Sequence, residues 1–376
     1  MRQAECISDE SQFTQLQPEW TKLWNSCARR SLFLTHEWFR SCWNEIREFH
    51  QLRIVLVRDC GRLVFLAPLM KTRSKSKGFP IECFTFIEHP ESQRQNFLIT
   101  EGYDQAGLFA EFLTFISEDR SADWNMLSLD KIPAESRTVQ LLSDAATSCG
   151  WKFETTTSHA SLYIHLNRAW ESYLGGRSPR FRKTLRNVTN RINQLGRIDV
   201  RSYSGCEAAM IAFEKLCAVS VSSWKASDGI AITSQPARIQ FFQELFAKQG
   251  DNVRIWILEA DDVPIASETQ VIDGSTVYAL RADYDERFSA QSPGFYLQYE
   301  ILKQLFGSSY EIYDFGIGVN AYKTRWTQER QALLNWRLYN ETLYSRLLYS
   351  ADKYDRLLRR MPGLRALHGF VANRGV

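Results

Sequence analysis

Hydrophobic runs separated by polar turns predict a three-stranded antiparallel meander in the second half of the chain. Its strands are expected at residues 253–258, 263–272 and 275–282, which are rich in β-branched and aromatic residues. Asp261-Asp262 separates the first two runs, and Asp273-Gly274 separates the last two. Because Asp-Gly between two such runs is a strong hairpin signal, the three strands are expected to be neighbours in one sheet.

A shorter version of this meander is predicted in the first half of the chain. Residues 52–57 and 62–70 are two strand-like runs on either side of a turn at 59–61. Leu52-Arg53-Ile54 matches Val253-Arg254-Ile255 in residue type. The likeness indicates that both halves contain the same supersecondary unit.

A second likeness appears further along each half. The apolar run 124–129 resembles the run 310–315, and a predicted helix precedes each of them, at 105–117 and 293–306. Two parallels in the same order predict a duplicated domain rather than a chance match.

The strongest helix pattern lies between the two meanders, at residues 178–195. Ser178 is a suitable N-cap, Pro179 takes the first helical position, and Gly196 lies just past the end. Its apolar residues recur at spacings of four and three and form one stripe: Phe181, Leu185, Val188, Ile192 and Leu195. The other faces are strongly basic and include Arg182 and Arg186.

The domain boundary is expected near Asn167, after a predicted strand at 161–166. This gives a first domain at 1–166, a second at 167–340, and a basic helical tail at 341–376. Further helices are expected at residues 18–28, 36–46, 135–149, 206–221 and 236–248. The predicted fold class is α/β, with a mixed, mostly antiparallel sheet flanked by helices in each domain.

Composition narrows the class of protein. With 376 residues, of which 44% are hydrophobic and 13% aromatic, the chain can form two cores, so extended disorder is excluded. The net charge of +3 is too small to indicate a DNA-binding protein. The N-terminus is polar, and no run approaches the ~20 apolar residues of a membrane-spanning helix. A cytoplasmic protein without an integral membrane segment is therefore expected.

The eight cysteines do not suggest a metal site. They are scattered, with no C-x-x-C and no Cys/His cluster at metal-ligand spacing. We expect them to be small buried hydrophobic residues, and we expect no metal.

Candidate chemistry gathers after the second meander. The run Ser292-Pro293-Gly294-Phe295 begins a predicted helix soon after the meander ends at Tyr284. A helix start offers free amides and a positive dipole end, which suit a pyrophosphate. The next strand, 312–315, carries Asp314 and runs into Gly316-Ile317-Gly318. An acid at a strand end beside a flexible loop is typical of a site in α/β proteins.

Together these residues resemble the CelD/BcsL-type branch of the GNAT acyltransferases, which is related to the tandem-GNAT Fem-type aminoacyltransferases. The resemblance runs from about Trp20 to Trp326 and is strongest from Arg180 onward. Its motifs are Arg180-Phe181-Arg182-Lys183-x-Leu185-Arg186, Ser223-Trp224, Ser292-Pro293-Gly294, Tyr313-Asp314-Phe315-Gly316 and Tyr322-Lys323-x-x-Trp326.

The resemblance implies two tandem GNAT-like domains, of which the second carries the chemistry. The first has Ser128-Leu129-Asp130 in place of the acid-glycine turn, so it is expected to be structural or to form one wall of the acceptor pocket. The implied reaction is direct attack of a substrate amine on an acyl donor held between splayed strands. The donor is expected to be an acyl-CoA, most simply acetyl-CoA. The acceptor would be a small-molecule, sugar or polysaccharide-precursor amine.

The resemblance also suggests roles for individual residues. Asp314 would orient or deprotonate the amine, with Glu268 as a second candidate, while Lys323 and Tyr322 would stabilise charge or return the proton. The remaining candidates fall into two groups, donor anchoring by Ser292, Pro293, Gly294, Phe295, Arg182 and Arg186, and substrate binding by Trp224 and Tyr284.

Each of these roles has a structural alternative. Asp314 could cap the glycine turn, and Lys323 could be a solvated lysine. Glu268 could face water, and Trp224 could be a lid or core aromatic residue.

Two other functions stay open. The glycine-rich pyrophosphate loop of single-domain acetyltransferases is replaced only partly by Gln291-Ser292-Pro293-Gly294. An aminoacyl-tRNA donor, bound by the basic helix 177–201 and the basic tail, is therefore the second hypothesis. The third is a binding protein that keeps the fold without catalysis.

Overall fold

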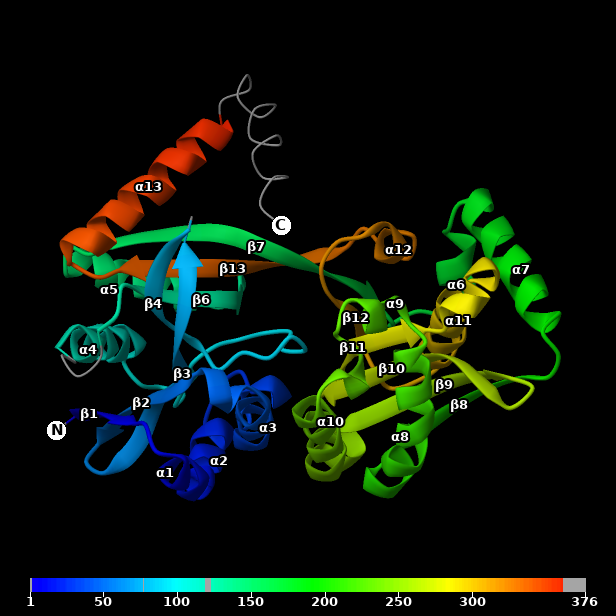
Figure 1. Ribbon diagram of the computed structural model, residues 1–376, viewed down its shortest axis with the longest axis horizontal. Helices are drawn as coiled ribbons and strands as arrows, with labels where there is room; N and C mark the ends of the chain where they lie inside the picture. Colours follow the sequence, from blue (N-terminus) through cyan, green and yellow to red (C-terminus); the bar gives the residue numbers. More distant parts are fainter. Residues whose placement is uncertain (1, 77, 119–122, 361–376) are drawn as a thin grey trace.

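The computed structural model describes residues 2–76, 78–118 and 123–360 and shows two lobes (Figure 1). The first lobe is drawn in blue to cyan and the second mainly in green to yellow. Thirteen strands of the described residues form one continuous sheet that runs through both lobes. Along this sheet the strand order is β1-β2-β3-β4-β6-β13-β7-β12-β11-β10-β9-β8, with β5 beside β3.

The strands divide between the two halves of that sheet. The first half contains β1 (Arg2–Ile7), β2 (Gln51–Asp59), β3 (Arg62–Ser76), β4 (Phe79–Phe86), β5 (Leu98–Ile99) and β6 (Met126–Pro133). The second half contains β8 (Ile198–Ser204), β9 (Val253–Ala260), β10 (Val263–Asp273), β11 (Thr276–Tyr284) and β12 (Ile312–Ile317). The long strands β7 (Lys152–His165) and β13 (Arg330–Tyr339) lie between the halves.

The second meander is confirmed, because β9, β10 and β11 are antiparallel neighbours. β12 then pairs in parallel with β11, matching Thr276 with Ile312 and Tyr278 with Asp314. In the first half, β4 pairs in parallel with β6, matching Cys83 with Met126. Each half therefore has antiparallel strands followed, after a helix, by a parallel strand. The two sequence likenesses correspond to this topological repeat.

β7 and β13 tie the two lobes together. β7 pairs with β13 over most of its length, while its last residues, Ser161 to His165, pair with β12. β13 also pairs with β6, so the chain returns to the first lobe after completing the second. This return, visible as the long orange strand beside β7 in Figure 1, was not expected from the sequence.

Helices cover both faces of the sheet. Those of the first lobe are α1 (Glu10–Gln15), α2 (Gln17–Asn25), α3 (His36–Ile46), α4 (Gln105–Glu118) and α5 (Thr138–Ser148). Those that follow are α6 (Trp170–Gly175), α7 (Pro179–Asn193), α8 (Cys206–Val221), α9 (Trp224–Ser227), α10 (Pro236–Gln249), α11 (Pro293–Leu305), α12 (Ala321–Thr324) and α13 (Leu343–Arg360). In the second lobe, α6, α7 and α11 pack on what we call the near face, and α8 and α10 pack on the far face.

The core of the far face extends across both lobes. It unites apolar residues of α2, α3, α8 and α10 in one cluster. The Phe33 ring lies 5.2 Å from that of Tyr278, and the Trp38 ring lies 6.0 Å from that of Phe241. Because a shared core resists separation, the lobes form one packed unit.

The predicted helices between the meanders are confirmed in type and position. The α7 helix begins at Pro179, and the Ser178 hydroxyl accepts a hydrogen bond from the Phe181 amide. The tail is helical from Leu343 to Arg360, and its predicted continuation lies outside the described residues. No helix within the described residues combines the length and apolar character needed to cross a membrane.

The expectation that every cysteine is buried is wrong for two of them. Cys60 and Cys149 are exposed because each lies at a turn, beside Gly61 and Gly150 respectively. Cys42 and Cys83 are buried as expected, and Cys6, Cys27 and Cys217 are half-buried. The side-chain environment of Cys206 lies outside what the structure describes.

Candidate active site

The two parallel strands β11 and β12 separate shortly after they begin. Their pairing ends at Tyr278 and Asp314, and beyond this point β11 continues to Tyr284 while β12 turns away at Gly316. β11 also has a register shift against β10 at Leu280, between the pairs of Ala279 and Arg281. Such a bulge bends a strand and releases its edge from pairing. The separation opens a cleft of about 550 Å³.

The α11 helix begins at one end of this cleft. Ser292, Pro293, Gly294 and Phe295 all line it. Ser292 has a left-handed backbone, and its carbonyl accepts hydrogen bonds from the Phe295 and Tyr296 amides. Pro293 has no amide hydrogen, so Gly294 provides the first free amide of the helix. The helix start therefore presents fewer amides than the sequence suggested, although its dipole still points toward the cleft.

Glu268 is at the centre of a polar network on the near face. Its side chain is 2% exposed, and its Oε1 atom accepts hydrogen bonds from the Tyr313 hydroxyl at 2.6 Å and from Gln270 at 2.7 Å. Gln298 of α11 donates to the Tyr313 oxygen at 2.9 Å. The Tyr322 hydroxyl donates to Gln298 at 3.1 Å, which completes a chain from Glu268 to Tyr322.

Burial shifts the acid–base properties of this network. It raises the pKa of Glu268 to about 7, against the opposing effects of the Tyr313 and Gln270 hydrogen bonds and the Lys323 charge. Burial also raises the pKa of Tyr322, an effect that the Glu268 charge reinforces. A carboxyl group with a pKa near neutrality can accept and release protons near neutral pH.

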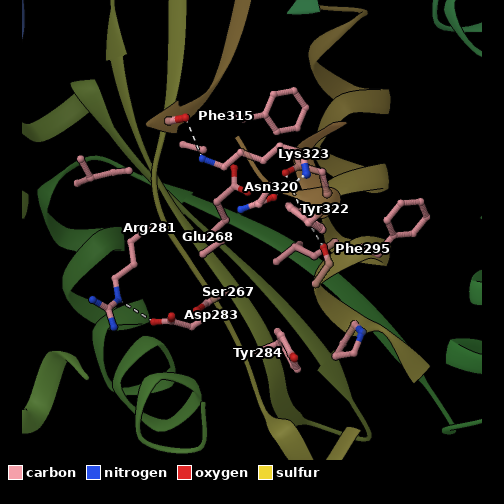
Figure 2. Close-up of a pocket in the computed structure, with 18 of the residues that line it drawn as sticks. Ser267, Glu268, Arg281, Asp283, Tyr284, Phe295, Phe315, Asn320, Tyr322 and Lys323 are labelled. Atoms are coloured by element: carbon pink, nitrogen blue, oxygen red, sulfur yellow. Dashed lines mark hydrogen bonds and ion pairs between the residues drawn. The ribbon is translucent and has the colours of Figure 1, made fainter. Parts of the chain in front are cut away.

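Lys323 belongs to α12, and its side chain reaches the end of β12, where the strands have parted. Its ammonium donates to the carbonyls of Gly316 and Ile317, each at 2.8 Å. Burial lowers its pKa to about 8, although the negative charges of Asp314 and Glu268 oppose this. Figure 2 shows Lys323, Asn320 and Tyr322 together above Glu268. Lys323 is therefore a positive charge fixed beside the opening between the strands.

A second group of residues, both charged and uncharged, lies on the far face. We call this group the acceptor wall, and it consists of Ser267, Arg281, Asp283, Trp224, Lys225 and Gln93. Arg281 donates to Asp283 at 2.7 Å, as Figure 2 shows, and to Glu91 at 3.1 Å. The Lys225 ammonium lies 2.6 Å from Asp283. Burial alone would raise the pKa of Asp283, but the charges of Lys225 and Arg281 outweigh it and lower this pKa.

The first lobe contributes the connection between β4 and β5 to this cleft. The Gln93 side-chain oxygen, Oε1, accepts a hydrogen bond from the Ile317 amide at 2.9 Å, and Glu91 binds Arg281. The neighbouring Arg94 pairs with Asp314 at 3.0 Å. Residues far apart in the sequence therefore close one side of the cleft, which no local pattern could have indicated.

Asp314 faces away from the cleft. It is 1% exposed, and besides Arg94 it accepts hydrogen bonds from Ser161 and from the Gly316 amide. It lines a different hollow of about 270 Å³, with Arg94, Tyr163 and Tyr278. Its partners match the alternative in which it caps the glycine turn.

The other sequence candidates divide into two groups. Trp224 and Tyr284 line the cleft, and the Tyr284 ring lies beside Gly294. Arg182 instead donates to the carbonyls of Gly175 and Arg177, and neither Arg182 nor Arg186 is among the residues that line the cleft. Arg325 lines the cleft in their place.

Sequence reasoning named Trp224 but missed the other residues of the acceptor wall. Arg281 and Asp283 alternate on a strand that the sequence did predict, and two charges on one face of a buried strand were a usable signal. Gln298 carried no such signal, because an amide inside an amphipathic helix is ordinary.

Comparisons with known proteins agree with this geometry. Residues 179–324 match the family model described as an acetyltransferase (GNAT) domain, and this range includes every residue that lines the cleft except Gln93 and Arg325. The fold resembles the crystal structure of FemX, with a TM-score of 0.56 and 12% identity over 92% of this chain and 100% of that one. No curated protein matches the chain.

Two further solved structures share the fold. The C-terminal domain (DUF2156) of a putative lysylphosphatidylglycerol synthetase from Agrobacterium fabrum has a TM-score of 0.54 and 12% identity, over 90% of this chain and 96% of that one. A conserved protein of unknown function from Bacteroides thetaiotaomicron VPI-5482 has a TM-score of 0.53 and 12% identity, over 90% and 100%. The domain match supports an acyltransferase with a GNAT-type domain at residues 179–324.

Proposed function

We propose that the protein is an acyl-CoA-dependent N-acyltransferase of the CelD/BcsL type that acts in a ternary complex. The observation that carries the proposal is the parting of β11 and β12 beside the start of α11. Beyond Tyr278 the edge of β11 no longer pairs with β12, so its backbone can bind the amide groups of a pantetheine arm as an added strand would.

The residues of the near face leave room for such an arm. Opposite Gln270 and Glu268, β11 presents only Ala279 and Ala282. These small side chains do not obstruct the opening. The diphosphate of the donor would lie at the α11 start, near the Gly294 amide and the Arg325 side chain.

We assign three roles in the transfer. The substrate amine attacks the thioester carbonyl and forms the new C–N bond, and its proton passes to Glu268. Lys323 stabilises the negative charge that develops on the carbonyl oxygen. When the C–S bond breaks, the Tyr322 hydroxyl gives its proton to the leaving thiolate and is later reprotonated from Glu268 through solvent.

A basic helix favours a second candidate, an aminoacyl-tRNA-dependent transferase. Arg180, Lys183, Arg186 and Arg191 are exposed on α7 and could contact RNA phosphates. Binding of a polyelectrolyte weakens steeply with salt, whereas coenzyme binding depends on it less. The third hypothesis, a non-catalytic scaffold, predicts no turnover with either donor.

A thermal-shift experiment separates these functions. Coenzyme A and acetyl-CoA at saturating concentration should raise the Tm, because a ligand that binds only the folded state stabilises it. Bulk tRNA should not raise the Tm.

The kinetic test uses acetyl-CoA and a panel of amines. Tyr322→Phe and Glu268→Gln should each lower kcat about 10²-fold or more. A rise in Tm with tRNA alone, lost at high salt, would favour the second candidate.

A further inference from the structure

We propose that the acceptor wall binds an amine carried on a polyhydroxylated, sugar-like molecule without a negative charge. This inference rests on the proposed function and specifies its acceptor. The wall lies across the sheet from Glu268, since Ser267 and Glu268 are neighbours on β10 and point to opposite faces. Ser267 and Asp283 are directly paired, so they share the far face.

Ser267 has an unmet hydrogen-bonding capacity. Its side chain is 1% exposed and lines the cleft, and its hydroxyl has no hydrogen-bond partner among the described residues. A buried hydroxyl without a partner costs free energy that a ligand hydroxyl or amine can offset. This group therefore indicates that a polar ligand atom binds at the far face.

The charges of the wall are already paired. Asp283 holds Lys225 through one carboxylate oxygen and Arg281 through the other. Arg281 also binds Glu91 and donates to the Ile230 carbonyl at 2.9 Å. Because both cations of the wall are engaged, an acceptor with a phosphate or carboxylate would have to break an existing ion pair. A neutral, hydroxylated ligand would not.

Trp224 adds an apolar surface beside these polar groups. It begins α9 and is 44% exposed although it lines the cleft. The Lys225 ammonium lies 5.9 Å from the centre of its ring. A sugar ring has an apolar face of C–H groups and a rim of hydroxyls, so it can stack on an indole while its hydroxyls bind to Ser267 and the polar groups beside it.

The first lobe contributes Gln93 to the acceptor wall. Gln93 lines the cleft, and both atoms of its side-chain amide are hydrogen-bonded. The oxygen accepts from the Ile317 amide, and the nitrogen donates to the Glu91 backbone carbonyl. The acceptor would therefore contact both lobes. This arrangement gives the first lobe, which has no acid-glycine turn of its own, a place in substrate selection.

The test compares two acceptors, glucosamine and cadaverine, with acetyl-CoA as donor. Glucosamine should have the higher kcat/KM by about tenfold or more, since cadaverine has an amine but no hydroxyls. Ser267→Ala and Trp224→Ala should raise KM for glucosamine about five- to tenfold while leaving KM for acetyl-CoA and the Tm shift with coenzyme A unchanged. Trp224→Phe should retain most of the affinity. Phe49→Ala, an exposed aromatic residue outside the cleft, is the matched control.

Saturation-transfer NMR with glucosamine and no donor tests the site separately from catalysis. Signal transfer to the sugar protons, lost in Ser267→Ala and Trp224→Ala, would support the proposal even if no acyl transfer occurs. No transfer in the wild-type protein, or equal turnover of cadaverine, would overturn it. A missing Tm shift with coenzyme A, together with normal glucosamine binding, would contradict only the proposed donor.

Discussion

Glu268 is the residue whose assigned role differs most between the sequence prediction and the structure. The sequence placed it second to Asp314 as a base. The fold directs Asp314 away from the cleft, in contact with Arg94, and leaves Glu268 as the carboxyl group that lines the cleft on the near face. Asp314 is better described as a positioning residue, because it holds the Gly316 amide at 2.8 Å where β12 turns.

Glu268 should also make stability depend on pH. Burial raises its pKa from the ordinary 4.5 to about 7, so between these pH values the folded state holds a proton that the unfolded state has released. Ionisation of Glu268 therefore lowers the free energy of unfolding as the pH rises through this window. Glu268→Gln keeps an acceptor oxygen for Tyr313 but cannot ionise.

We expect Glu268→Gln to become more stable relative to the wild type between pH 5 and pH 8, by about 1–3 kcal/mol. Urea denaturation of both proteins at the two pH values measures this change. The same stability difference at both pH values would show that Glu268 does not ionise with a raised pKa.

At the scale of elements, the parting of β11 and β12 depends on Gly316. Its φ angle is +77°, in the region that favours glycine, and an added Cβ would lie 2.8 Å from the Ala279 carbonyl oxygen of β11 and 3.1 Å from Gln93. A side chain here would push against β11 and against the loop of the first lobe. Gly318 has a similarly positive φ of +98°, but an added Cβ would meet nothing within 4 Å.

Alanine variants of these two glycines distinguish the cost of backbone strain from the cost of a steric clash with β11. Gly318→Ala should lose about 1 kcal/mol of stability from strain alone and keep its KM for acetyl-CoA. Gly316→Ala should lose at least about 1 kcal/mol more and raise that KM severalfold, because β12 is displaced from the opening. Denaturation and steady-state kinetics measure both effects. Equal losses of stability in the two variants would argue against a clash between the added Cβ at position 316 and the Ala279 carbonyl.

At the scale of the whole molecule, the two lobes should unfold together. β7 pairs with β13 and β12, and the core of the far face includes residues of both lobes. Calorimetry should therefore give one transition whose van't Hoff and calorimetric enthalpies agree. A fragment of residues 167–340, which lacks β7, should show no cooperative transition. Two resolved transitions in the full chain, or a folded fragment, would show that the lobes are independent.

The sequence by itself determined the local elements and their repetition. The runs of β-branched and aromatic residues, the Asp273-Gly274 turn and the Ser178-Pro179 cap act through neighbouring residues. The second meander and α7 were therefore predicted within a few residues of their observed bounds. The helix start at Pro293 was predicted for the same reason.

Only the tertiary structure decided which side chains meet. Arg281, Glu91 and Gln93 come together across 190 residues of sequence, and the same long-range packing directs Asp314 toward Arg94 and leaves Glu268 lining the cleft. A period-two pattern shows that two residues share a face, but it does not show what covers that face. The return of β13 to the first lobe depends in the same way on pairing between distant strands, which composition and periodicity do not record.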